Sequence, residues 1–364
     1  MDLNPDSVQA GAATAMDALW LVPPVIVADI AGLPSPAAAL LASHLASARL
    51  RTGVATAAWQ KAGHRNQFLA PDDHAAVART DFTKVRLCVV GKLFLDVRPA
   101  DWLATCVRAK ESGAKLILDI CDYPFAQKPP DVVRFYEEAL RLADAVTVNS
   151  GRMAELMSQH TTQAPQVIED AILAAPRRPE FAPGKVLELL WFGHINNARY
   201  LERMMDALIA YSAKQRCRLT IVTEPGQGVE QAARQITQNC APRFEARFAA
   251  WSLEATRIAL RQCDLVLIPG DPSDPLKSGV SSNRLAETLQ AGRLPVASPL
   301  ASYLPFGESA WLGDDLVAGI TWAMANRGEV LVRLRRGQTQ VMERLAQEAI
   351  GKQWCRLFGE LAAD

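Results

Sequence analysis

Short apolar runs of strand length alternate with helical patterns along both halves of this chain of 364 residues. In the first half a leader of about 20 residues precedes five expected strands, at Val25–Ile30, Val54–Trp59, Val85–Val90, Lys115–Ile120 and Ala145–Asn149. Strands that are apolar throughout and separated by helices form parallel sheets covered on both faces. The pattern therefore predicts an α/β fold.

A proline-rich segment, Ile168–Lys185, interrupts this alternation and reads as a linker. The alternation then restarts, with expected strands at Leu187–Phe192, Arg218–Thr223, Phe244–Phe248, Leu265–Ile268 and Leu294–Ala297. A chain of this length can bury two cores. We therefore expect two Rossmann-like domains, residues 1–180 and 181–340, followed by a terminal helical segment, 341–364.

Charge and cysteine content exclude several classes of protein. The chain carries 39 basic and 39 acidic residues, so net charge gives no reason to expect a nucleic-acid partner. The seven cysteines are scattered without a C-x-x-C pair, which favours a reducing compartment. The first residues lack the basic start of a signal peptide, and the apolar stretch Ala18–Ile30 is too short to span a bilayer. We expect a cytoplasmic protein without a transmembrane segment.

The most informative stretch, Cys263–Ser298, reads as strand, polar loop, helix and strand. Backbone N–H groups at the start of the helix, Asn283–Gln290, are unpaired and favour a phosphate, and Lys277 in the loop adds a positive charge. Glu287 lies one helical turn after Asn283, where a carboxylate would suit the two hydroxyls of a ribose. This order of groups predicts a cradle for a nucleoside diphosphate, with Ser282, Asn283 and Arg284 as further candidates at the helix start.

Other candidate ligand-binding residues follow strands of the second half. Ligands of open parallel sheets bind beyond the carboxyl ends of the strands. Gly193, His194 and Asn197 form the loop after the first of these strands; an ordinary strand–helix turn is the alternative. Glu224 begins a glycine-containing turn that lacks the third glycine of a nicotinamide-dinucleotide fingerprint. Trp251 could border a nucleobase or pack between helix and sheet.

In the first half Asp29, Asp122 and His64 are candidates for the general base, each with a structural role as the alternative. The five histidines form no H-x-x-x-H pair, and no D-x-D pair stands at a strand end, so no protein-bound metal is expected.

The segment around Glu287 and Ala291-Gly292-Arg293-Leu294-Pro295-Val296 resembles the donor-binding motif of GT-B glycosyltransferases, especially their GT4-like branch. The resemblance implies two facing Rossmann-like domains and a final helix that packs back on the first domain. It also implies a nucleoside-diphosphate sugar as donor, bound by the second domain, and a sugar, lipid-linked or protein acceptor, bound by the first.

In this branch the motif has the form E-x7-E, and its first Glu would fall on Gly279, so that residue is absent here. The resemblance implies metal-independent transfer in which Lys277 and the helix amides stabilise the leaving diphosphate, with no permanently bound cofactor. Two alternatives remain open: a sugar-nucleotide epimerase of the same fold, and a non-catalytic binding or assembly protein on this scaffold.

Overall fold

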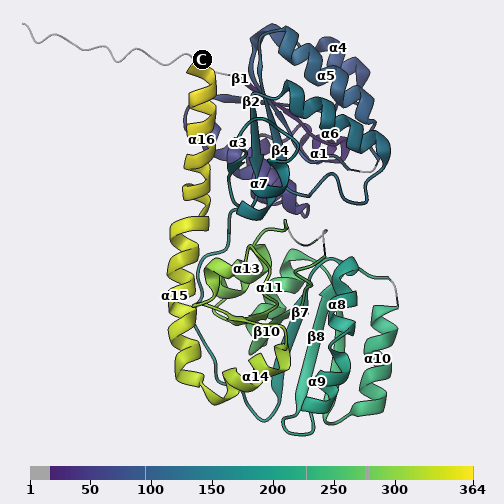
Figure 1. Cartoon of the computed structure of the whole chain (residues 1–364), viewed down its shortest axis with the longest axis vertical. Coiled ribbons are helices and arrows are strands. Elements are labelled where there is room, and N and C mark those ends of the chain that lie inside the picture. The colour runs from purple at the N-terminus through teal and green to yellow at the C-terminus, as the bar shows by residue number, and fades with distance from the viewer. Residues whose placement is uncertain (1–16, 95, 227, 275–276, 278, 364) are drawn as a thin grey trace, which may run out of the picture.

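The computed structural model describes residues 17–94, 96–226, 228–274, 277 and 279–363, and these form two lobes (Figure 1). Each lobe contains a parallel sheet of six strands with helices on both sides. The expected fold class, two Rossmann-like lobes, is confirmed.

The sheet of the first lobe has the order β2-β1-β3-β4-β5-β6. Its strands are β1 (Asp17–Leu21), β2 (Arg65–Leu69), β3 (Val85–Val90), β4 (Lys115–Ile120), β5 (Ala145–Val148) and β6 (Gln166–Val167). Its helical segments are α1 (Pro24–Ile30), α2 (Pro36–Leu41), the π-helical turn η1 (Ala48–Thr52), α3 (Gly53–Lys61), α4 (His74–Arg79), η2 (Phe82–Lys84), α5 (Pro99–Glu111), α6 (Pro130–Leu142) and α7 (Gly151–Met157).

The sheet of the second lobe has the order β12-β11-β10-β7-β8-β9. Its strands are β7 (Leu187–Phe192), β8 (Cys217–Thr223), β9 (Phe244–Ala250), β10 (Leu265–Ile268), β11 (Leu294–Ala297) and β12 (Trp311–Leu312). Its helical segments are η3 (Ile195–Asn197), α8 (Ala198–Glu202), α9 (Met205–Tyr211), α10 (Val229–Cys240), α11 (Leu253–Gln262), α13 (Asn283–Gln290), η4 (Leu304–Phe306), α14 (Leu316–Ala325) and α15 (Arg327–Leu345).

Two expected strands of the first lobe are wrong, because both segments are helices. Val25–Ile30 lies in α1, which begins at Pro24 and buries only Ile26 and Ile30, one turn apart. Proline at the first helical position removes no hydrogen bond and has a suitable φ. Val54–Trp59 lies in α3, a continuation of the π-helical turn before it. No turn residue ends that helix earlier, and its apolar run contains several alanines, which favour helix.

The first two strands of the chain are instead β1, which the expected leader partly covered, and β2. Every residue of β1 is buried, because β1 pairs with β2 on one side and with β3 on the other. Strand β2 lies at the sheet edge and is largely polar, so its sequence gives no apolar run. The first 16 residues of the leader lie outside the described ranges.

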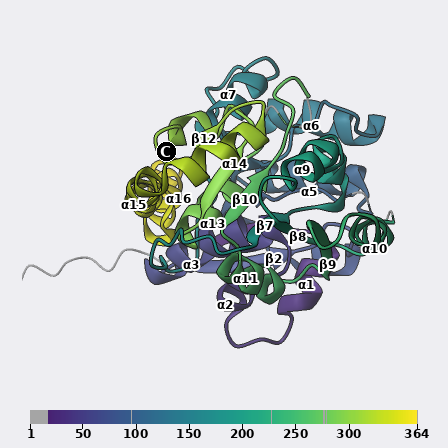
Figure 2. The same ribbon diagram turned by 90° about the horizontal axis from the view of Figure 1, so that it is seen from below.

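The chain ends in α16 (Gln347–Ala363), which continues beyond α15 and packs against α3 of the first lobe (Figure 1). Seen from below, α15 and α16 lie at the same side of the molecule (Figure 2). In the contact with the first lobe, Trp354 and Phe358 meet the ring of Trp20 edge-on, at centroid distances of 6.3 and 5.9 Å. One cluster of buried apolar side chains therefore extends from the second lobe through the terminal helices to the first sheet.

None of the helices in the described ranges combines the length and apolarity needed to cross a bilayer.

Candidate functional site

A cavity of about 430 Å³ lies between the lobes, beyond the carboxyl ends of strands from both sheets. The first lobe contributes segments after β3 and β4 and part of α6, and the second lobe contributes the loop after β7. The lining residues are Lys92, Leu93, Phe94, Cys121, Asp122, Pro124, Lys128, Val132, Tyr136, His194 and Asn196. Because ligands of open parallel sheets bind at this edge, the cavity is the candidate functional site.

The loop after β7 brings Gly193 and Arg284 together. Gly193 has a φ of 155°, and a Cβ at this position would lie 3.2 Å from Nη1 of Arg284. The missing side chain thus leaves space for the guanidinium, whose Nη1 is 3.5 Å from the Phe192 carbonyl oxygen. His194 is exposed at the cavity wall. Asn197 is buried, and its Oδ1 has no hydrogen-bond partner in the described part of the chain.

Glu224 and Trp251 support this loop and the neighbouring sheet. The Glu224 carboxylate accepts hydrogen bonds from the backbone N–H of Ile195, at 2.9 Å, and from the Thr223 hydroxyl, at 3.1 Å. Trp251 is half-buried and packs against the apolar core, and its backbone N–H donates to the Thr223 carbonyl oxygen. Neither residue lines the cavity between the lobes.

Three cations from different elements approach one another beside the cavity. The pKa of the Lys277 ammonium is lowered by partial burial and by the positive charges of Arg284 and Arg199, against which Asp274 and Asp122 act. Arg199 donates from Nη2 to Oδ2 of Asp274 at 2.6 Å. The Lys277 side chain has no hydrogen bond or ion pair with any described residue. A surplus of positive charge on this scale fits an anionic ligand such as a diphosphate.

Arg199 is a candidate that the sequence interpretation missed. It lies in α8, immediately after the loop that contains Gly193. A basic residue in the first turn of a helix that follows a glycine-containing loop is the sequence signal that would have indicated it.

The start of α13 faces the linker as well as the cations. Ser282 is buried, and its hydroxyl does not cap the helix. The Asn283 side-chain amide donates to Oδ2 of Asp170 at 2.7 Å, so this side chain is engaged by the linker. The backbone N–H groups of the first turn have no partner within the helix and can bind an anion.

Glu287 is half-buried on α13. Burial raises the pKa of its carboxyl group, although the positive charges of Arg49, Arg257 and Arg284 act to lower it. Arg49 belongs to the first lobe and Arg257 to α11. The carboxylate has no hydrogen bond to a side chain in the ranges described, so its oxygens are available to a ligand.

At the position of the first Glu of the E-x7-E motif, the structure places Gly279 in close contact with the first lobe. Gly279 is buried, and a Cβ there would lie 2.7 Å from Cε of Met153 and 3.4 Å from Cδ1 of Leu156 in α7. The Gly279 carbonyl oxygen accepts a hydrogen bond from the hydroxyl of Ser150. Gly279 is therefore packed against α7 of the first lobe, and a side chain at this position would require the end of the Met153 side chain to move.

Asp122 is the only carboxylate among the described residues that line the cavity. Its Oδ2 lies 2.5 Å from Nζ of Lys92. Burial acts to raise the pKa of Asp122, but Lys92, Lys128 and Lys277 together lower it. The carboxylate is therefore ionised at neutral pH and surrounded by lysines from both lobes.

The other two candidates of the first lobe lie away from the cavity lining. Asp29 is exposed in the last turn of α1. His64 precedes β2 at its amino end, and its ring stacks on Trp59 at a centroid distance of 3.8 Å. The amino ends of parallel strands lie at the opposite sheet edge from their carboxyl ends, so the stacked ring faces a different side of the lobe.

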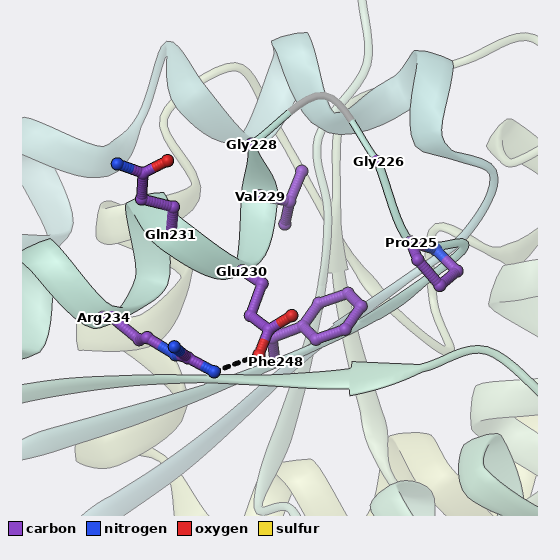
Figure 3. Close-up of a pocket in the computed structure, with 8 residues that line it drawn as sticks. All are labelled: Pro225, Gly226, Gly228, Val229, Glu230, Gln231, Arg234 and Phe248. Carbon is purple, nitrogen blue, oxygen red and sulfur yellow. Dashed lines mark hydrogen bonds and ion pairs between the residues drawn. The ribbon is translucent and has the colours of Figure 1, made fainter.

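A second hollow, of about 540 Å³, lies beside the start of α10, next to β9 (Figure 3). Pro225, Gly226 and Gly228 form one side, and the ring of Phe248 projects from β9 between them and the helix (Figure 3). Glu230 is paired with Arg234 at 2.5 Å, so the charges at this site are mutually neutralised. Because the hollow begins directly after Glu224, it extends the ligand edge of the second sheet.

Among the residues that the structure describes, no group of three or more His, Cys, Asp or Glu side chains is arranged to hold a metal ion.

No protein-family model matches the sequence, and no curated protein matches it. The fold, in contrast, is similar to several solved structures. HepE from Anabaena in complex with UDP-glucose has 13% sequence identity and a TM-score of 0.65, over 95% of this chain and 100% of that one. A glycosyltransferase from Rickettsia africae has 10% identity and a TM-score of 0.69, over 96% and 99%. The catalytic domain of starch synthase IV from Arabidopsis thaliana, bound to ADP and acarbose, has 10% identity and a TM-score of 0.60, over 97% and 100%.

These similarities extend over nearly the whole of each chain, so both lobes and their arrangement are shared. The protein therefore has the GT-B fold, the fold of these glycosyltransferases.

Proposed function

We propose that the protein is a glycosyltransferase that binds a nucleoside-diphosphate sugar with its second lobe and an acceptor with its first. The observation that carries the proposal is the group formed by Lys277, Arg199 and Arg284 beside a cavity at the carboxyl ends of both sheets. Structural neighbours were solved with UDP-glucose, UDP or ADP, which supports a sugar nucleotide as ligand.

In the proposed complex the diphosphate lies against the three cations and the first turn of α13, while the Glu287 carboxylate accepts hydrogen bonds from the ribose hydroxyls. Gly193 allows the ligand to approach the loop backbone, with His194 and Asn197 as further donor-side residues. The hollow beside Phe248 (Figure 3) then provides space for the base, with Trp251 after β9 as a further candidate at its edge.

In the transfer step an acceptor hydroxyl oxygen bonds to the anomeric carbon, and the bond from that carbon to the diphosphate oxygen breaks. The diphosphate leaves with the bonding electron pair, and the cations stabilise the negative charge that develops on it without a metal ion. The hydroxyl proton passes to the Asp122 carboxylate, which faces the cavity. The Asp122 carboxylate is ionised, as a general base must be, and the neighbouring lysines that lower its pKa also make it a weaker base.

We assign residues 1–180 to the acceptor side, 181–340 to the donor side and 341–364 to the terminal helix, and we place the reaction in the cytoplasm. The acceptor is a sugar, a lipid-linked sugar or a protein. The GT4-like branch is the subfamily that the motif around Glu287 favours.

The first experiment is a thermal-shift screen with UDP, GDP, ADP, TDP and CMP, with and without magnesium. A ligand at 100 times its dissociation constant adds about 2.7 kcal/mol of stability, which corresponds to several degrees in the unfolding midpoint. We expect one diphosphate to produce this shift without metal. Lys277→Ala should weaken its binding by about 10-fold or more, the usual size of a charge-assisted hydrogen bond.

Lys214→Ala is the matched control, because Lys214 is exposed and follows α9 away from the cavity lining. It should leave the ligand shift unchanged. If no nucleotide shifts the wild-type protein, the proposed donor site is refuted.

The glycine at position 279 favours one second candidate, a non-catalytic sugar-nucleotide-binding protein, because it stands in place of the first acidic residue of the motif. Donor binding without transfer to any acceptor would support this candidate. Conversion of the donor in the absence of an acceptor would instead indicate an epimerase.

A further inference from the structure

The acceptor side of the cavity carries more positive than negative charge. Lys92, Lys128 and Asp122 are its charged side chains from the first lobe among the described residues. Lys92 and Asp122 form an ion pair of 2.5 Å and so neutralise each other. The Lys128 ammonium has no ion pair or hydrogen bond with any residue in the described ranges, and it contributes to the lowered pKa of Asp122. One positive charge at the cavity therefore remains without a partner.

The donor does not account for this charge. The proposed diphosphate site consists of Lys277, Arg199 and Arg284, all in the second lobe. Lys128 lies in the first lobe, on the segment that leads into α6, and lines the cavity from the opposite side. A ligand that occupies the first-lobe side and uses this cation must carry its own negative charge.

The remaining surface of this side is largely apolar. Phe94 and Val132 line it, with the half-exposed ammonium of Lys92 5.8 Å from the centre of the Phe94 ring. Tyr136 is buried, and burial raises the pKa of its phenol, so the phenol stays protonated and can donate a hydrogen bond. An apolar wall with a cation at the rim suits a sugar ring that bears one acidic substituent.

We propose that the acceptor carries an anionic group, a carboxylate or a phosphate, that is bound by Lys128 beside the Lys92–Asp122 pair. This inference rests on the proposed glycosyltransferase function and names the chemical class of its acceptor. Anion binding at Lys128 holds the acceptor on the first-lobe side of the cavity, opposite His194 and Asn196 of the donor side.

The test compares neutral and acidic sugars that differ only at the sixth carbon: methyl glucoside, methyl glucuronide and methyl glucoside 6-phosphate. Their binding to the full chain is measured by saturation-transfer NMR in the presence of the diphosphate selected in the thermal-shift screen. We expect at least one acidic sugar to bind about 10-fold or more tightly than methyl glucoside, with an affinity that falls as salt rises. Comparison of the glucuronide with the 6-phosphate shows whether the site prefers a carboxylate or a phosphate.

Lys128→Ala should remove this preference, and Lys128→Arg should restore it because the charge returns. Lys214→Ala should keep it. The nucleotide-induced thermal shift should be unchanged in all three variants, which separates the acceptor inference from the proposed donor site. Equal binding of neutral and acidic sugars to the wild type would overturn the inference, and so would a loss of nucleotide binding in Lys128→Ala, since Lys128 would then belong to the donor site.

Discussion

At the scale of single residues, Glu287 shows how a ligand-binding group can reduce the stability of the free protein. Burial raises the pKa of its carboxyl group in the folded state, so folding favours the protonated form. Above the folded pKa the group is ionised in both states, and the cost of burying its charge is then fully present. As the pH falls through the folded pKa, the cost is relieved and stability rises relative to a neutral side chain.

We therefore predict that Glu287→Gln raises the thermal midpoint of the ligand-free protein at pH 7, and that its advantage over the wild type shrinks towards pH 4. The same variant should respond less to the nucleoside diphosphate, because the amide is a poorer acceptor for ribose hydroxyls. Glu360→Gln, an exposed change on α16, is the control and should alter neither property. A lower midpoint for Glu287→Gln at pH 7 would show that attraction to the neighbouring arginines outweighs burial.

At the scale of elements, the contact between α16 and α3 depends on one glycine. A Cβ at Gly351 would lie 2.8 Å from the Cβ of Ala58, which is fixed to the α3 backbone, so the helices would have to separate. A Cβ at Gly359 in the same helix would meet nothing within 4 Å. Alanine substitutions at these two positions therefore separate the effect of helix packing on stability from the effect of helix propensity.

We predict that Gly351→Ala destabilises the protein by about 1–3 kcal/mol, the usual cost of overpacking, reduced by the better helix propensity of alanine. Gly359→Ala should stabilise it by up to about 1 kcal/mol. Urea unfolding followed by circular dichroism measures both. Equal stabilisation by the two substitutions would show that α16 does not pack closely on α3 in solution.

Elements with a buried interior and clear boundaries could be predicted from the sequence. Strands β4, β7 and β10 and helix α13 have the expected bounds, since each is a short apolar or amphipathic run between turn residues. The segments at Val25–Ile30 and Val54–Trp59 could not, because periodicity does not distinguish a short buried helix from a buried strand.

The residues of the candidate site also divide into those that the sequence predicted and those that it did not. The sequence placed Lys277, Gly193 and Glu287 at the carboxyl edge of the second sheet, where local order along the chain determines position. It missed Arg199, although the position of this residue just after the loop that contains Gly193 was a local signal. It also missed Lys128 and the pairing of Lys92 with Asp122, because the cavity that these residues line joins segments far apart in the sequence.

At the scale of the whole molecule, the chain crosses between the lobes at two places that lie together. Ile172 of the linker forms a parallel bridge with Ala346, between α15 and α16, and its N–H donates to the Leu345 carbonyl oxygen at 2.7 Å. Arg344 also donates to Glu169 of the linker at 3.0 Å. Any movement of one lobe relative to the other must therefore bend or shift both crossings together.

A buried network beside this crossing connects both lobes to the linker. Arg51 of the first lobe is 1% exposed and bonds Asp119 of β4, with Nη2 2.5 Å from Oδ1. Its Nη1 lies 2.8 Å from Oδ1 of Asp170 in the linker, whose Oδ2 accepts from Asn283 at the start of α13. The guanidinium thus bonds two buried carboxylates, balances one of their two negative charges, and fixes the linker against the donor helix.

Arg51→Ala would leave Asp119 and Asp170 buried without a countercharge, which typically costs about 3–5 kcal/mol. We predict a loss of this size in urea unfolding of the full chain. Asn283→Ala removes only one hydrogen bond to a charged group and should cost less, about 1.5–3 kcal/mol. Arg336→Ala is the control, because Arg336 pairs with Glu308 on the surface and such pairs contribute about 1 kcal/mol or less. If Arg51→Ala were no more costly than Arg336→Ala, water would have to reach the network, and the linker would not be held between the lobes as the structure shows.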